Sequence, residues 1–218
     1  TRSTPPIRLG IAGTGAVGAT VAKAVDAGDV PGVELTAVAA SGPARFDALH
    51  SELPRAVAFA SFEELADTCD WVLEAGPPAI FEALARPVLD KAKTLVVLSC
   101  SQLLDRDDLI SRAQETGARS VVPSGAILGL DALKAAAVGT LTSVTIETRK
   151  PVAALIKAPD VASQAIDLTG ISEPMQIFSG AVSEGARAVP ANVNVAAALA
   201  LAGMGAGQTR MQVWADPT

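Results

Sequence analysis

The chain has 218 residues, of which 50% are hydrophobic and 18% are charged, so it is long enough to bury a core and too apolar to stay disordered. A formal net charge of −6 and a 3% aromatic content argue against nucleic-acid binding. Cys69 and Cys100 form neither a disulfide scaffold nor a zinc motif, and the longest apolar stretch, near residues 195–207, is too short and glycine-rich to span a bilayer. We therefore expect a cytoplasmic globular protein that binds no metal, membrane or nucleic acid.

The first half of the sequence alternates between apolar strands and helices. Strands are expected at residues 7–12, 33–40, 70–75, 94–100 and 119–123. Helices are expected from the glycine-rich turn to Gly28, after Ser61 (with Glu64 at capping-box spacing), at 78–92 and up to Gly117. This alternation predicts an α/β domain over residues 1–123, with a parallel sheet covered by helices on both faces.

From residue 124 to residue 218 strands and helices no longer alternate strictly. A helix is expected at 131–139, strands at 143–151 and 173–180, a helix at 192–203 and a last strand at 209–216. This order indicates a second α+β domain.

Gly13, Gly15 and Gly18 form a G-x-G-x-x-G pattern between the first strand and the first helix. In that context the first glycine allows a tight turn, the second lets a pyrophosphate approach the backbone, and the third lets the helix lie close to the strand. The free N–H groups of the helix N-terminus then face the phosphates. Residues expected to bind the cofactor here are Gly13, Thr14, Gly15, Ala16, Val17 and Gly18; the alternative is a tight turn with spare glycines.

The end of the second strand predicts which dinucleotide is preferred. NAD-binding folds place an acidic residue there to hold the ribose hydroxyls, whereas this chain has Ser41 and Arg45. Ser41 can donate a hydrogen bond to a 2′-phosphate and Arg45 can pair with it, so NADP is expected to bind at least as well as NAD. The alternative is that Arg45 is a solvated charge at a helix start.

Ligands of open α/β sheets bind beyond the carboxyl ends of the strands. Small or polar residues stand at those ends here: Ala75, Gly76 and Pro77, then Ser99 to Ser101, then residues 123–126. Cys100 has no recognisable neighbouring base, so we interpret it as a small residue packed beside the cofactor rather than as a nucleophile.

The motifs "VVPSGAILGLDALKAA", "SVTIETRKP", "PANVNVAAALALAG" and "VWADP", in this order, closely resemble those of the L-aspartate dehydrogenase family. The resemblance covers essentially the whole chain. It implies a Rossmann domain followed by an α+β domain of the dihydrodipicolinate-reductase type, usually in a homodimer. It also implies hydride transfer between C2 of L-aspartate and nicotinamide, with iminoaspartate as a product that feeds NAD biosynthesis or hydrolyses to oxaloacetate and ammonia.

By the same resemblance, Ala126 and Asn194 match positions that contact the cofactor, while Asn192 is expected to cap the helix and Asn194 to lie one turn inside it. The alternative is that both amides serve the helix start.

The family pattern continues past Asp216 and Pro217 with an Arg-Asn pair and a catalytic histidine, and the given chain ends before that segment. The one histidine of the given chain, His50, is expected at the surface or at a helix end and does not match the family's catalytic histidine. The sequence therefore leaves the catalytic residue unknown.

A site for aspartate needs paired donors with positive charge. Arg149 and Lys150 end a strand of the second domain, and Ser124 offers a hydroxyl at the domain junction. These residues are the candidates for substrate binding, although a solvated basic pair at a strand end is equally compatible with the sequence. Two alternative functions stay open: a dinucleotide-binding protein without catalytic activity, and a dehydrogenase of another small amino or imino acid.

Overall fold

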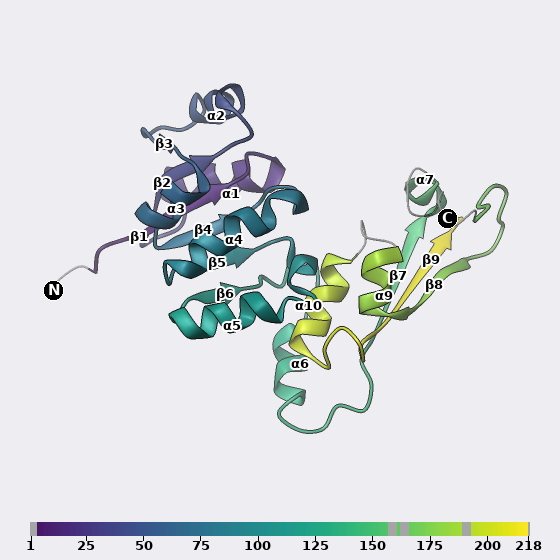
Figure 1. The fold of residues 1–218 in the computed structure, drawn as a ribbon. Coiled ribbons are helices and arrows are strands. Elements are labelled where there is room, and N and C mark those ends of the chain that lie inside the picture. Colours follow the sequence, from purple (N-terminus) through teal and green to yellow (C-terminus); the bar gives the residue numbers. More distant parts are fainter. Residues whose placement is uncertain (1–3, 157–160, 162–165, 189–192, 218) are drawn as a thin grey trace. The chain divides into compact units, whose positions relative to one another are not determined.

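The computed structural model describes residues 4–156, 161, 166–188 and 193–217. The chain divides into two compact units, Thr1–Pro123 and Ser124–Thr218, whose elements are labelled in Figure 1. None of the helices within the described ranges is long and apolar enough to cross a membrane.

The first unit is built on a six-stranded sheet in which every neighbouring pair of strands is parallel. In spatial order the strands are β3 (Ala58–Phe59), β2 (Val33–Ala39), β1 (Ile7–Ala12), β4 (Trp71–Glu74), β5 (Thr94–Val97) and β6 (Arg119–Val121). This is the doubly wound order, with β1 and β4 at the point where the winding reverses. The predicted Rossmann sheet is confirmed.

Helices cover both faces of this sheet. Its helices are α1 (Ala16–Ala27), α2 (Pro43–His50), α3 (Phe62–Thr68), α4 (Phe81–Asp90) and α5 (Asp107–Thr116). Leu9 and Ile11 of β1 pack with Val25 of α1 in one hydrophobic cluster. On the other face, a Cβ added to Gly10 would lie 2.8 Å from Sγ of Cys69, directly after α3, so the helices press closely on the central strand from both sides.

The local signals at helix ends are confirmed. Gly28 ends α1 in the left-handed conformation, at φ 88°, and Gly117 ends α5 in the same way, at φ 78°. Ser61 and Glu64 form the complete capping box at the start of α3. These signals depend on residues within one helical turn of each other, which explains why the sequence alone predicts them.

Several predicted boundaries are wrong. The predicted helix 78–92 is a 3-10 turn, η1 (Pro78–Ile80), followed by α4, and the predicted strand 94–100 stops at Val97. Beyond it, Ser99 bonds to Glu74 and a second 3-10 turn, η2 (Cys100–Leu103), begins. The strand predicted to reach residue 123 stops at Val121, and α2 and β3 are elements that the sequence analysis did not predict.

The second unit contains a three-stranded sheet with β7 (Thr145–Pro151) and β8 (Met175–Ala181) on either side of β9 (Arg210–Asp216). Strand β9 is parallel to β7 and antiparallel to β8, which confirms the predicted α+β character. Its helices include α6 (Leu130–Ala136), α9 (Val182–Ala188) and α10 (Asn194–Ala202), together with the single turn α7 (Val152–Leu155). Helices α7 and α9 were not predicted.

Alternate residues of β9 form the core side of this sheet, with Met211, Val213 and Ala215 all at 0% exposure. A Cβ on Gly185 of α9 would lie 2.8 Å from Sδ of Met211, so α9 lies directly on this side.

Asn194 is the first residue of α10, so its predicted place one turn inside the helix is wrong. The helix begins two residues later than expected, and Asn192, the predicted cap, lies outside the described residues.

Candidate functional site

The glycine turn, residues 13–18, lies against the chain segment that follows β4. Gly13 has φ +113°, and a Cβ at this position would lie only 2.4 Å from the carbonyl oxygen of Ala75. A Cβ on Gly18 would lie 2.0 Å from the carbonyl oxygen of Gly13. Both positions therefore need glycine, the first for its backbone conformation and both for close approach.

Gly15 differs from Gly13 and Gly18, the other two glycines of the motif. No heavy atom lies within 4 Å of a Cβ added there, and its φ of −74° is ordinary. Gly15 is also the N-cap of α1, and no side chain caps the helix at this point. The first N–H groups of α1 are thus available to an external anion, and the free space at Gly15 lets that anion approach the backbone.

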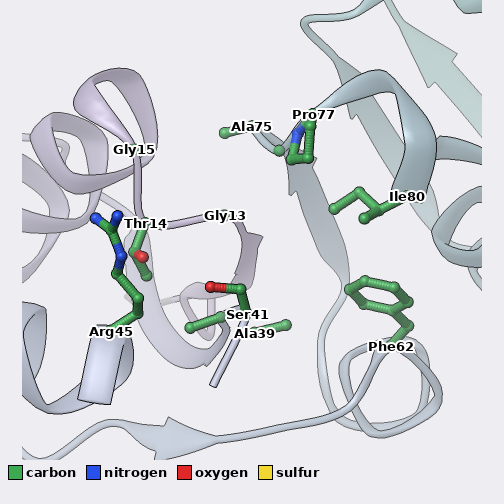
Figure 2. Close-up of a pocket in the computed structure, with 12 residues that line it drawn as sticks. Gly13, Thr14, Gly15, Ala39, Ser41, Arg45, Phe62, Ala75, Pro77 and Ile80 are labelled. Atoms are coloured by element: carbon green, nitrogen blue, oxygen red, sulfur yellow. The ribbon is translucent and has the colours of Figure 1, made fainter. Parts of the chain in front are cut away.

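A cavity of about 380 Å³ opens beside this turn (Figure 2). Four parts of the first unit line this cavity: the glycine turn, the chain from the end of β2 to the start of α2, Phe62 at the start of α3, and the segment after β4. The lining residues are Gly13, Thr14, Gly15, Ala39, Ala40, Ser41, Arg45, Phe62, Ala75, Gly76, Pro77 and Ile80. Most of the sequence-predicted cofactor residues of this unit meet here. Ala16 and Val17 face solvent, Gly18 is buried under the turn, and Cys100 is buried at the start of η2 without lining the cavity.

Ser41 and Arg45 lie at one side of this cavity, where α2 begins. Pro43 is the first residue of α2, so the helix places Arg45 in its first turn, and Figure 2 shows the side chain extending toward the segment of Thr14. Among the described residues that line the cavity there is no aspartate or glutamate. A cavity with a free helix N-terminus, a hydroxyl and a guanidinium fits the diphosphate and the 2′-phosphorylated ribose of a dinucleotide.

The sequence analysis missed Glu74, the last residue of β4. Its side chain is completely buried and accepts hydrogen bonds from the backbone N–H of Ser99 at 2.8 Å and from Oγ of Ser99 at 3.1 Å. The available signal was a glutamate inside the apolar run "DWVLEAG", because a carboxylate in a central strand must find partners.

A second cavity, of about 670 Å³, lies wholly within the second unit. It is lined by Ala126, Ile127 and Leu128 before α6, by residues 146–150 of β7, and by Asn194 and Val195 at the start of α10. The structure thus brings together Ala126, Asn194, Arg149 and Lys150, which are far apart in the sequence. Ser124 and Gly125 precede this lining and do not take part in it.

Arg149 and Lys150 differ in their surroundings. Nε of Arg149 donates to Glu147 at 2.9 Å, and its guanidinium lies 5.7 Å from the ring centre of Trp214. Lys150 pairs in register with the buried Ala215 and projects on the other side of the sheet, where it is half-buried. In the described part of the chain no carboxylate forms an ion pair with Lys150, so its ammonium group is available to a ligand anion.

Electrostatics single out no catalytic base in either cavity. The pKa values of Asp70 and Asp108 are lowered to about 2, by hydrogen bonds from Arg8 and Arg106 respectively, and neither aspartate lines a cavity described above. Among the described residues there is also no group of three or more metal-ligating side chains.

Comparison with known proteins agrees with this geometry. Residues 131–218 match the family model described as "Aspartate dehydrogenase, C-terminal", and residues 13–123 match "Homoserine dehydrogenase, NAD binding domain". The L-aspartate dehydrogenase of Bradyrhizobium diazoefficiens is 41% identical over 97% of this chain and 75% of its own length. This chain belongs to the L-aspartate dehydrogenase family.

Other members of the L-aspartate dehydrogenase family match over a similar range. L-aspartate dehydrogenase 3 of Bordetella bronchiseptica is 40% identical over 96% of the chain and 77% of its own length. The fold agrees with the crystal structure of aspartate dehydrogenase from Thermotoga maritima, with a TM-score of 0.72 and 24% identity over 97% of this chain and 79% of that one. The first unit is therefore the NAD(P)-binding Rossmann domain of a dehydrogenase.

Proposed function

We propose that this protein catalyses the NAD(P)-dependent interconversion of L-aspartate and iminoaspartate. The observation that carries this proposal is the match to L-aspartate dehydrogenases over nearly the whole chain. Iminoaspartate would then either feed NAD biosynthesis or hydrolyse to oxaloacetate and ammonia.

The cofactor is assigned to the first cavity. The diphosphate lies at Gly15 and the N-terminus of α1, where the backbone is open and the helix N–H groups are uncapped by side chains. Ser41 and Arg45 hold the adenosine ribose and its 2′-phosphate, so NADP binds at least as tightly as NAD. The backbone of Ala75 and Gly76 forms the wall opposite the glycine turn.

The substrate is assigned to the second cavity. Aspartate carries two carboxylates, and Lys150 is the lining cation without an ion-pair partner in the described ranges, so it binds one of them. Asn194 and Ala126 line the same cavity, and the family resemblance implies that they contact the cofactor.

A bound nicotinamide would supply the hydride acceptor or donor for C2 of the substrate. In the oxidative direction the C2–H bond breaks with its electron pair, the amino nitrogen loses a proton, and a C=N bond forms. The chain binds the carboxylates and orients C2, and this positioning is the part of catalysis that its described residues supply.

The proposal is tested by adding L-aspartate with NADP or NAD and measuring reduced cofactor, and by the reverse reaction with oxaloacetate and ammonia. Aspartate-dependent reduction of both cofactors supports the assignment. Cofactor binding without turnover of aspartate would contradict it and favour a protein that only binds dinucleotides. Reduction with another amino acid and none with aspartate would contradict the substrate.

We also propose a cytoplasmic homodimer. The two cysteines of the chain, Cys69 and Cys100, are not joined by a disulfide, as suits a reducing compartment, and the family resemblance implies the dimer. Light scattering of the purified protein measures its mass, and a mass equal to one chain at micromolar concentration would contradict the dimer.

A further inference from the structure

Glu74 is a buried carboxylate that the proposed chemistry does not use. Its side chain has 0% exposure, and in the described part of the chain no lysine or arginine pairs with it. Burying a carboxylate costs free energy unless hydrogen bonds compensate. Both oxygens are compensated by a single residue, Ser99, through its backbone N–H at 2.8 Å and its hydroxyl at 3.1 Å.

These hydrogen bonds join the two segments that follow the carboxyl ends of the neighbouring parallel strands β4 and β5. Ser99 lies directly before η2, in the connection that follows β5. Glu74 directly precedes Ala75 and Gly76, which form a wall of the first cavity. The connections after β4 and β5 are therefore held to each other at the point where ligands of doubly wound sheets bind.

The same wall supports the glycine turn. A Cβ on Gly13 would lie 2.4 Å from the carbonyl oxygen of Ala75 and 2.8 Å from the nitrogen of Gly76. Ala75 is also tied to the residue before the turn, because its backbone N–H donates to the carbonyl oxygen of Ala12 at 2.9 Å, so we expect a displacement of Ala75 to displace the turn as well. The position of Ala75 thus sets the position of the backbone that receives the diphosphate.

We propose that Glu74 is a positioning residue for the dinucleotide site. Through its two hydrogen bonds to Ser99 it locks Ala75 and Gly76 in place, and through them it holds the glycine turn in the geometry that binds the cofactor. The proposal rests on the assignment of the first cavity to NAD(P).

A second buried carboxylate provides a matched control. The side chain of Asp26, in the last turn of α1, is at 0% exposure and bonds to Nε of Arg55 at 2.8 Å. It lies at the opposite end of α1 from the glycine turn and lines neither cavity. Replacing either carboxylate disturbs a buried polar contact, but only Glu74 is linked to the cavity wall.

The test measures the Kd for NADPH by calorimetry and the thermal midpoint for E74L, E74Q, S99A and D26L in the full chain. We expect E74L to weaken NADPH binding about tenfold. We expect E74Q to restore near-normal binding, because its amide accepts from the Ser99 N–H and donates to the hydroxyl. D26L should lower the thermal midpoint while Kd stays within about twofold of wild type.

S99A keeps the hydrogen bond from the backbone N–H of residue 99 to Glu74 and loses the one from the hydroxyl, so it should weaken NADPH binding about threefold. This variant tests the proposal even if E74L does not fold. Unchanged Kd in folded S99A and E74L would overturn the proposal, as would an equal loss in D26L. Failure of the wild-type protein to bind NADPH or NADH would instead contradict the proposed function, so the two failures are distinguishable.

Discussion

At the scale of single residues, Ser41 and Arg45 replace the acidic residue that favours NAD in related folds. A carboxylate at position 41 would repel a 2′-phosphate, so Ser41→Asp is expected to weaken NADP binding at least about tenfold while NAD binding changes little. Ser41→Ala, the control, removes one hydrogen bond without adding charge and should cost NADP only a fewfold. Fluorescence titration with both cofactors measures the ratio; a wild-type protein that binds NAD more than tenfold tighter than NADP would contradict the assignment.

The glycine turn allows a separation of folding from binding. Gly15 has space around it and extended backbone, so Gly15→Val should fold normally and bind cofactor at least about tenfold more weakly. Gly18→Ala forces a Cβ toward the carbonyl oxygen of Gly13 and should lower the free energy of unfolding by about 1–3 kcal/mol. Circular dichroism on heating and NADPH titration check the pair, and normal binding by folded Gly15→Val would refute the location of the diphosphate.

At the scale of elements, the Arg8–Asp70 ion pair joins β1 to the residue before β4. Both side chains are more than 40% exposed, so solvent screening keeps the contribution of this pair to stability small. The hydrogen bond from Arg8 lowers the pKa of Asp70 from 3.8 to about 2, so the folded state binds a proton only at lower pH than the unfolded state does. The stabilisation is therefore complete above about pH 4 and is lost as the pH falls toward 2.

Asp70→Asn tests this pH dependence. The variant should be slightly less stable than the wild-type protein near neutral pH, and the difference should shrink as the pH falls from about 4 to 2. Urea denaturation at a series of pH values measures it. A difference that stays constant through this range would show that the carboxylate charge contributes nothing.

At the scale of the whole molecule, the two units are expected to carry separable binding steps. Lys150→Met should leave NADPH affinity within about twofold, because the cofactor cavity lies in the first unit, and should weaken L-aspartate binding to the NADPH-loaded protein about tenfold or more. Arg149→Met is the matched control: its guanidinium is engaged by Glu147 and Trp214, so aspartate binding should change much less. If calorimetry shows that Arg149→Met weakens L-aspartate binding more than Lys150→Met does, Arg149 and not Lys150 binds the substrate carboxylate.

The sequence predicted most of what depends on near neighbours in the chain. The glycine turn after β1, the capping box of Ser61 and the end of α1 at Gly28 each involve residues within a turn or two of each other. The parallel sheet followed from the alternation of apolar strands with helices. The start of α10 was misplaced by two residues: the sequence favoured Asn192 as the cap, whereas Val193 precedes the first turn in the structure and no side chain caps it.

By itself, the sequence therefore determined the α/β fold class, the place of the glycine turn and the absence of an acid at position 41. Only the tertiary structure decided that Glu74 meets Ser99, that Ala75 supports Gly13, and that Arg149 is engaged by Trp214 while Lys150 stands on the other side of the strand. These contacts depend on which strands become neighbours and in which register they pair. That choice is made by burying the apolar faces of the whole sheet, to which residues far apart in the sequence contribute together.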